Sequence, residues 1–158
     1  MRIYIRNLIA GRTEQFYQAG IRNEQARLFV PAILSYRDAI KSNDDSGYKD
    51  AKDRIEKLLE NAGVKVTIKA YNDRGIALYN AKQLLPAKAQ FAEALRIDAK
   101  DDTANDYKKK ADRDLSKLAD AAYAAGETLL KAYNYVGAQN KFREAVTLFP
   151  EHEEAREK

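Results

Sequence analysis

Three stretches of the chain repeat one pattern of small and aromatic residues, and this repetition limits the fold more than any other feature. Each copy has a glycine, a small residue twelve positions later, an aromatic residue at sixteen and an alanine at nineteen. The residues at these positions are Gly20, Ala32, Tyr36, Ala39, Gly75, Ala87, Phe91, Ala94, Gly126, Ala138, Phe142 and Ala145. Such internal similarity is the signature of a repeat architecture, in which each copy is one supersecondary unit.

The last three residues of each copy are spaced as one face of an α-helix, because they lie at positions i, i+4 and i+7. The residue before the first alanine is Pro31, Pro86 or Gly137. Proline is tolerated in the first turn of a helix, since its missing N–H would have no intrahelical partner there. Each copy is therefore predicted to be a helical hairpin whose first helix ends near residue 29, 84 or 135. The second helices are expected at about 31–42, 86–98 and 137–149.

The composition favours an all-α protein. Charged residues make up 33% of the 158 residues and hydrophobic residues 45%, and the chain has only three prolines and seven glycines. No cysteine is present, which excludes disulfides and thiolate chemistry. No apolar run approaches the roughly 20 residues that span a bilayer, and Arg2 and Arg6 interrupt the opening stretch. We therefore expect neither a secretory signal nor a transmembrane segment, and the compartment stays open between cytoplasm and periplasm.

The spacing of glycine, alanine and aromatic residues resembles that of the tetratricopeptide repeat (TPR) family. That family also favours a proline 24 residues after the glycine, which Pro150 supplies in the third copy, whereas Asp44 and Ala99 stand there in the others. The resemblance implies one domain over residues 1–158, built as a TPR-like solenoid of three helical hairpins with extended first helices. The repeats would cover about 12–44, 46–99 and 102–150, with 151–158 as a tail or the start of a capping helix, and the chain could be a segment of a longer array.

The distance between copies departs from that family. TPRs recur every 34 residues, whereas the three glycines lie 55 and then 51 residues apart. Both inserts begin with acids and a hydroxyl, which suit a helix N-terminus; they are Asp44, Asp45 and Ser46, and Asp101, Asp102 and Thr103. We predict first helices lengthened to about 46–83 and 102–134. The stretch AGVKVTIK (62–69) could instead be a short strand, or Gly63 could split the helix, but an isolated strand has nothing to pair with.

The lengthened helices carry apolar residues that a single hairpin cannot bury. These residues are Ile55, Leu58, Leu59 and Ala62 in the first insert, and Leu115, Leu118 and Ala119 in the second. We expect the two extensions to pack on each other and on the N-terminal segment that contains Ile3, Ile5, Leu8 and Ile9, with one edge left for a partner. The alternative is a coiled-coil-like contact with a second chain, and therefore a homo-oligomer.

Catalytic chemistry has little support. His152 is the only histidine and lies in a glutamate-rich terminal segment, where we expect it to be solvated. Helix capping explains Asp44/Asp45 and Asp101/Asp102 at least as well as acid–base chemistry or metal binding does. The prediction is that the protein is not an enzyme and has no catalytic, cofactor-binding or metal-binding residues.

The TPR resemblance also implies a concave face lined by side chains three before and one, four and five after each glycine. The predicted partner-binding residues on it are Tyr17, Ile21, Gln25, Asn72, Tyr79, Asn80, Tyr123, Leu130 and Lys131. Tyrosine, amide and aliphatic groups suit a docked peptide or helix. For Tyr17, Ile76 and Leu130, packing against neighbouring helices is an equal alternative.

These features predict a non-catalytic scaffold or adaptor, a subunit of a larger assembly of bacterial type that binds protein partners through its concave face and extended helices. The alternative is a helical module that binds nucleic acid or anionic lipid through Lys108–Lys110, Lys52 and Lys57, favoured by a net charge of +4. That alternative predicts an affinity that falls steeply with salt. We do not expect nucleic-acid binding, because most tyrosines fall on apolar helix faces rather than on a stacking platform.

Overall fold

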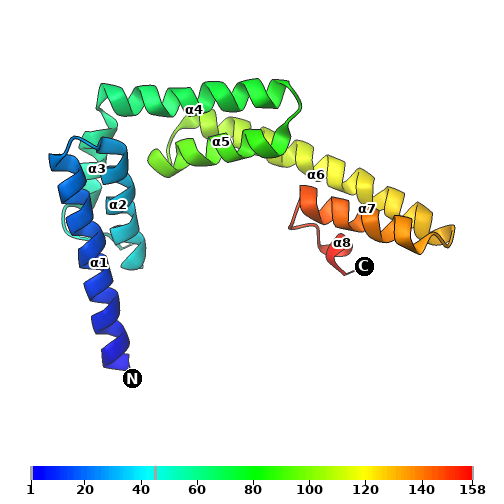
Figure 1. Ribbon diagram of the computed structural model, residues 1–158, viewed down its shortest axis with the longest axis horizontal. Coiled ribbons are helices and arrows are strands. Elements are labelled where there is room, and N and C mark those ends of the chain that lie inside the picture. The colour runs from blue at the N-terminus through cyan, green and yellow to red at the C-terminus, as the bar shows by residue number, and fades with distance from the viewer. Residues whose placement is uncertain (1, 45, 158) are drawn as a thin grey trace. The chain divides into compact units, whose positions relative to one another are not determined.

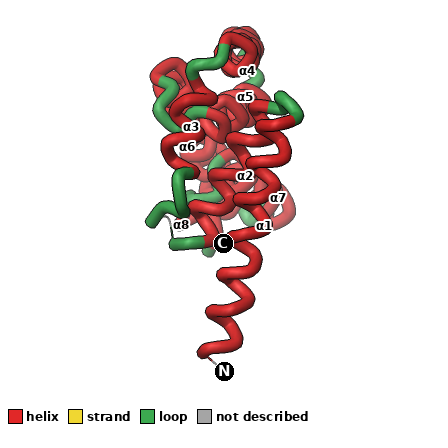
Figure 2. The backbone as a smooth tube through the Cα atoms, turned by 90° about the vertical axis from the view of Figure 1, so that its left-hand side faces the viewer, coloured by secondary structure: helices red, strands yellow, loops and turns green. Residues whose placement is uncertain are grey.

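The computed structural model describes the backbone of residues 2–44 and 46–157, and the side chains of residues 11–44 and 46–157. Within these ranges the chain forms only helices and loops (Figures 1 and 2). The helices are α1 (Arg2–Gln25), α2 (Phe29–Ser42), α3 (Ala51–Leu59), α4 (Ala62–Asn80), α5 (Leu84–Ile97), α6 (Asp102–Lys131), α7 (Tyr135–Leu148) and α8 (Glu153–Arg156). The prediction of an all-α protein is confirmed.

The chain divides into two compact units. The first comprises the chain up to Ala70 together with Ala94–Ala99, and the second comprises Tyr71–Glu93 together with the chain from Lys100 onwards. Helix α1 packs along α2 in the first unit, and α6 packs along α7 in the second (Figure 1). We call α1–α2 hairpin 1, the segment Tyr71–Glu93 around the α4–α5 turn hairpin 2, and α6–α7 hairpin 3.

The second helix of each copy lies where the sequence predicts it. Helices α2, α5 and α7 begin two residues before the predicted starts and end within one residue of the predicted ends. The first helices, however, end at Gln25, Asn80 and Lys131, about four residues before the predicted ends. The reason is that each hairpin has a three-residue turn that contains neither glycine nor proline, so the sequence gives no conventional signal for it.

The three turns have one backbone conformation. In each, the residue seven positions after the repeat glycine has a positive φ: 59° at Arg27, 62° at Lys82 and 57° at Tyr133. The next amide donates to the carbonyl five residues earlier, as in a Schellman motif; these hydrogen bonds are Leu28 N to Asn23 O (2.8 Å), Gln83 N to Leu78 O (2.9 Å) and Asn134 N to Leu129 O (2.9 Å). The repetition therefore extends to the backbone of turns whose sequences differ.

In each hairpin, the aromatic ring of the second helix lies directly against the backbone of the repeat glycine in the first helix. A Cβ placed on Gly75 would meet Phe91 at 2.5 Å, and one on Gly126 would meet Phe142 at 2.5 Å. On Gly20 it would overlap the ring of Tyr36 in the same way. Real Cβ atoms do not approach so closely, so only glycine fits. The alanines of the pattern are buried as well, with exposed fractions of 0–1%.

The first insert is not one long helix, so the prediction of a helix over 46–83 is wrong. Residues 46–50 are not helical, and α3 begins at Ala51. The helical conformation is then interrupted at residues 60 and 61, between α3 and α4. The side chain of Asn61 accepts a hydrogen bond from the amide of Gly63 at 2.9 Å, which satisfies one of the free donors at the start of α4. Residues 62–69 belong to α4, so this stretch forms no strand, and the interruption of the helix lies at the two residues before it. The second insert agrees with prediction, since α6 is continuous over 30 residues.

The apolar residues of the inserts are largely buried within their own units. Ile55 and Leu58 are each 7% exposed on α3, which packs on α2. Leu115 and Ala119 are 1% and 0% exposed on α6. Two residues differ, because Leu118 is 49% exposed and Ala62 is exposed. The side chains of the N-terminal segment expected to cover these extensions, Ile3, Ile5, Leu8 and Ile9, lie outside the described residues.

Asp101 caps α6, and its removal should cost stability. The Asp101 carboxylate accepts hydrogen bonds from the amide of Ala104 at 2.7 Å and from Nδ2 of Asn72, which is 6% exposed, at 2.8 Å. Asp101→Ala is therefore expected to lower the free energy of unfolding by about 1–2 kcal/mol. Asp102 is exposed in the first turn, and Asp102→Ala should cost only about 0.3–1 kcal/mol through the helix dipole. Urea denaturation of both variants measures the difference, and equal losses would contradict the capping role.

The first insert differs from the second at its start. Asp44 lies in a turn with φ 54° and does not cap a helix, and Asp45 lies outside the described residues.

In the described part of the chain, no helix is long and apolar enough to cross a membrane.

Candidate protein-binding surface

In hairpin 1, the first predicted partner-binding residue lies inside the fold. Tyr17 is 6% exposed, and its ring packs against those of Tyr36 and Tyr48 at centroid distances of 5.7 and 5.6 Å. Its hydroxyl donates to the carboxylate of Asp50. The expectation that Tyr17 faces a partner is corrected, because the segment before α3 folds over it.

Glu24, four residues after the glycine of hairpin 1, is also bonded within the fold. Glu24 accepts hydrogen bonds from the Tyr36 hydroxyl at 2.7 Å and from Nη1 of Arg54 at 2.9 Å. The Arg54 guanidinium lies 5.9 Å from the centre of the Tyr36 ring. Its hydrogen bond to Glu24 raises the pKa of Arg54 above the ordinary value. A side chain of α3 therefore fills the groove between Glu24 and Tyr36.

A carboxylate beside this cluster has a strongly lowered pKa. Hydrogen bonds from Lys49 (2.7 Å), and then from the hydroxyl of Tyr48, lower the pKa of Glu14 from 4.5 to about 2. A depressed pKa contributes stability that is present above pH 4.5 and is lost as the pH falls through about 2.

We therefore expect the Glu14 carboxyl to titrate near pH 2 in a carbon-detected NMR titration of the folded protein. Lys49→Gln should move its pKa back towards 4.5, because the charged hydrogen bond from Lys49, which contributes most to the lowered pKa, is lost. Lys57→Gln, a substitution of an exposed lysine on α3, is the matched control and should leave it unchanged. A Glu14 that titrates at its ordinary value in the unsubstituted protein would contradict the contact.

In hairpin 2, the ring of Tyr107 lies at the place that corresponds to that of Arg54 in hairpin 1. Tyr79, four residues after Gly75, donates its hydroxyl hydrogen to Asp114 at 2.6 Å, and this bond raises the pKa of Tyr79. Tyr107 of α6 packs edge-on against Tyr79 at 5.6 Å and stacks on Phe91 at 5.5 Å. The groove of hairpin 2 is thus filled by an aromatic side chain from the next helix.

Another predicted residue of hairpin 2 is corrected. Asn72 is buried, with its amide bonded to Asp101, so it cannot face a partner directly. Asn80 remains exposed at the end of α4.

In hairpin 3, Tyr123 packs against Phe142 at 5.4 Å and against the ring of His152 at 5.1 Å. The expectation that His152 is solvated is wrong, because it is only 7% exposed. Its Nδ1 accepts a hydrogen bond from the amide of Ala155 at 3.3 Å and so caps the short helix α8. The imidazole therefore serves as a small aromatic cap that closes one end of the hairpin.

The groove of hairpin 3 at the opposite end remains open. Its volume is about 330 Å³, and every residue that lines it belongs to hairpin 3. We call it the tip groove; it is lined by Leu130, Tyr135, Val136, Ala138, Gln139 and Phe142. Leu130 and Phe142 are the equivalents of Tyr79 and Phe91, so the tip groove corresponds to the place that Tyr107 fills in hairpin 2.

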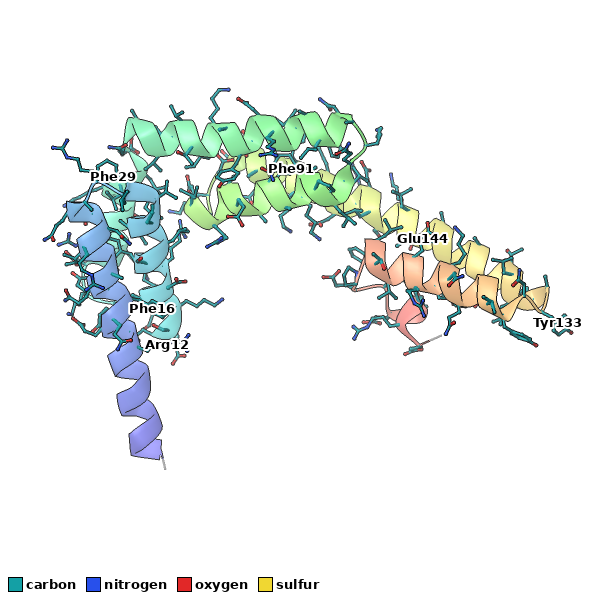
Figure 3. All side chains as sticks on the ribbon, viewed as in Figure 1. Arg12, Phe16, Phe29, Phe91, Tyr133 and Glu144 are labelled. Carbon is teal, nitrogen blue, oxygen red and sulfur yellow. The ribbon has the colours of Figure 1, made fainter. Side chains whose placement is uncertain are left out.

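Large apolar side chains stand in solvent around the tip groove. Tyr133, Tyr135 and Val136 are 79%, 63% and 72% exposed, and the two rings lie edge to face at 6.5 Å. At the same repeat positions in hairpin 2, Leu84 is 8% and Leu85 is 42% exposed. Figure 3 shows Tyr133 at the free end of the α6–α7 hairpin. An exposed apolar cluster of this kind is typical of an interaction site.

This cluster was not among the predicted partner-binding residues, although the sequence contains a signal for it. The stretch YNYV (133–136) places aromatic and β-branched residues in a turn and in the first two residues of the helix after it, where polar residues are the rule. Other predicted partner-binding residues remain accessible: Gln25 and Lys131 are exposed, and Ile21 and Leu130 are half-buried.

The basic run on α6 is partly engaged within the fold. Lys108 pairs with Asp112 at 2.9 Å, and the ammonium of Lys110 lies 4.4 Å from the centre of the Tyr107 ring. Lys52 and Lys57 are exposed on α3. No group of three or more histidine or acidic side chains in the described ranges has the geometry of a metal site.

No protein-family model matches the chain, and no curated protein is significantly similar to it in sequence.

Proposed function

We propose that this protein is a non-catalytic scaffold or adaptor, a TPR-like array of hairpins that binds a protein partner. The partner surface is centred on the tip of hairpin 3, and the accessible residues of the predicted concave face are further candidate contacts. Protein interfaces favour tyrosine and aliphatic side chains in their centres and polar side chains at their rims. Tyr133, Tyr135 and Val136 would form such a centre, and Lys131 and Gln139 lie in its rim.

The observation that carries the proposal is the aromatic side chain of Tyr133, which is exposed on a turn residue with a positive φ. Its φ of 57° is a conformation in which glycine is favoured over other residues by about 1 kcal/mol. In the other two hairpins, the same position holds a long polar side chain, Arg27 or Lys82. A tyrosine ring that is 79% exposed gains almost no burial in return. All three turns share this backbone strain, so what distinguishes Tyr133 is the large aromatic side chain left exposed, which is typical of an interaction site.

A photo-crosslinking experiment in the native cell tests this function. A photoreactive phenylalanine analogue is placed at position 133 and, as the matched control, at position 82, which has the same turn geometry. We expect position 133 to give a specific protein adduct that position 82 does not give. The same set of adducts from both positions, or none from either, would overturn the proposal.

A second substitution separates binding from folding. Tyr133→Gly should raise the free energy of unfolding by about 1 kcal/mol, because glycine adopts the positive φ without strain. It should also weaken binding of the captured partner, whereas Lys82→Gly should stabilise the fold and leave binding unchanged. Binding that survives Tyr133→Gly would count against the tip of hairpin 3 as the partner surface.

A further inference from the structure

We infer that Tyr17, Tyr48 and Glu14 form a binding site for the side-chain ammonium group of a lysine. In the chain by itself Lys49 occupies this site, and a lysine of a partner protein occupies it when Lys49 is displaced. We call the three side chains the ammonium cup. It belongs to hairpin 1 and the segment before α3, so it goes beyond the function proposed for the tip of hairpin 3.

The Lys49 ammonium group marks the position of the cation in the ammonium cup. Its Nζ lies 4.7 Å from the centre of the Tyr17 ring and 5.3 Å from that of the Tyr48 ring, and both distances are those of a cation–π contact. The two rings meet edge to face at 5.6 Å, so they form two adjacent walls. The third wall is the carboxylate of Glu14, whose two oxygens accept hydrogen bonds from Nζ at 2.8 and 2.7 Å.

The walls of the cup are held by hydrogen bonds that do not involve the ammonium group. The hydroxyl of Tyr17 donates to Asp50, and that of Tyr48 donates to one oxygen of Glu14. Nε2 of Gln18 donates to the other oxygen of Glu14 at 2.9 Å. Tyr17 is moreover only 6% exposed. We therefore expect the cup to keep its shape when the ammonium group is removed.

The present occupant of the cup can be displaced. The side chain of Lys49 is 46% exposed and that of Glu14 is 38% exposed. Ion pairs this accessible to water contribute little to stability, because each charge is well solvated on its own. The flexible stem of a lysine can also rotate away from the cup while the backbone stays in place. The advantage of Lys49 over another lysine is its attachment to the cup, which a partner with further contacts can overcome.

The chemistry of the cup selects a primary ammonium group. Both contacts to Glu14 are N–H···O hydrogen bonds, and a trimethylated nitrogen has no hydrogen to donate. An acetylated lysine has no charge, so it loses the ion pair and the cation–π contacts together. The hydrogen bond from Lys49 is also the largest cause of the lowered pKa of Glu14, which is about 2. The pKa of Glu14 therefore reports whether the cup is occupied.

Lys49→Gly empties the cup without strain in the backbone, because the φ of Lys49 is 47°, which glycine adopts readily. In this variant the pKa of Glu14 should rise from about 2 towards 4.5. The capped amino acid Nα-acetyl-lysine N-methylamide, added to about 300 mM at constant ionic strength, should bind saturably and lower that pKa again. Lys82→Gly, at an exposed turn residue with φ 62°, is the matched control and should show neither change.

Three comparisons locate and characterise the binding. The Nε-trimethylated ligand should bind the Lys49→Gly protein at least about tenfold more weakly than the lysine ligand, and the Nε-acetylated ligand should not bind. The unsubstituted protein should bind the lysine ligand about tenfold more weakly than Lys49→Gly does, because Lys49 competes for the cup. In the Lys49→Gly protein, Tyr48→Leu should weaken binding further, whereas Tyr48→Phe should retain most of it because the ring remains.

Four results would overturn the inference. They are the absence of saturable binding to Lys49→Gly, equal affinity for the lysine and acetylated ligands, equal affinity of the unsubstituted and Lys49→Gly proteins, and no binding to the unsubstituted protein at the highest concentration. The third result would mean that the ligand binds outside the cup, and the fourth that the cup is closed to any partner. The proposed function is tested separately, because the crosslinking experiment at position 133 involves no residue of the cup.

Discussion

Phe91→Ala is expected to lower the free energy of unfolding by about 3–5 kcal/mol, the range observed when a fully buried aromatic residue is reduced to alanine. Phe91 is 0% exposed and lies against both the backbone of Gly75 and the stacked ring of Tyr107. Its loss removes the contact within hairpin 2 together with the contact to α6. The cavity that remains lies between packed helices, which can refill it only by a shift of their backbones.

Urea denaturation followed by circular dichroism measures this loss. Tyr135→Ala is the matched control, since it removes a ring of similar size that is 63% exposed, and it should change stability by no more than about 0.5 kcal/mol. If Phe91→Ala cost less than about 1 kcal/mol, the ring would not be the central contact of hairpin 2, and the repeated pattern would have another explanation.

The core of each hairpin could be predicted from the sequence because its contacts are local. Gly20 and Tyr36 are sixteen residues apart, and a turn of fixed length brings them together in every copy. The spacing therefore determines which backbone meets which ring. The same argument placed α2, α5 and α7 to within two residues of their observed ends.

The break in the first insert could not be predicted in the same way. Helical periodicity continues from Ile55 through Val64 and Ile68, and all three residues are buried. The break depends on Asn61, whose side chain replaces the helical hydrogen bond of the Gly63 amide. Asparagine is found both inside helices and at their N-terminal caps. Tertiary packing rather than local propensity therefore decides which conformation Asn61 adopts.

The candidate site was predicted only in part, because other segments of the chain cover two of the predicted partner-binding residues. Tyr17 and Asn72 had the correct repeat positions, but Asp50 and Asp101 of the following segments bond to them. Such contacts join residues about thirty positions apart, and no local pattern identifies them. In hairpin 3, the segment after α7 packs on Tyr123 through His152, and the tip groove stays open.

Gly20→Ala is expected to destabilise the protein by about 1–3 kcal/mol, although alanine is the better helix former. The new methyl group would overlap the ring of Tyr36, which is 0% exposed and cannot swing away because its hydroxyl is bonded to Glu24. Gly11 lies on the same helix and provides the matched control. A Cβ there meets nothing within 4 Å, so Gly11→Ala should raise stability by up to about 1 kcal/mol.

Gly20→Ala and Gly11→Ala are then expected to change the free energy of unfolding in opposite directions. Since both replace glycine by alanine in α1, the difference between them separates the contact with Tyr36 from helix propensity. A further variant locates that contact on the ring, because Tyr36→Leu removes Cε1 and Cζ and replaces the rigid ring by a branched side chain that can rotate away from the new methyl group. In the Tyr36→Leu protein, Gly20→Ala should therefore lose its penalty, which gives a coupling energy of about 1–3 kcal/mol in the double-mutant cycle. An unchanged penalty in that background would show that Gly20 is required for its backbone alone, and the close approach of ring and glycine would then no longer explain the repeat.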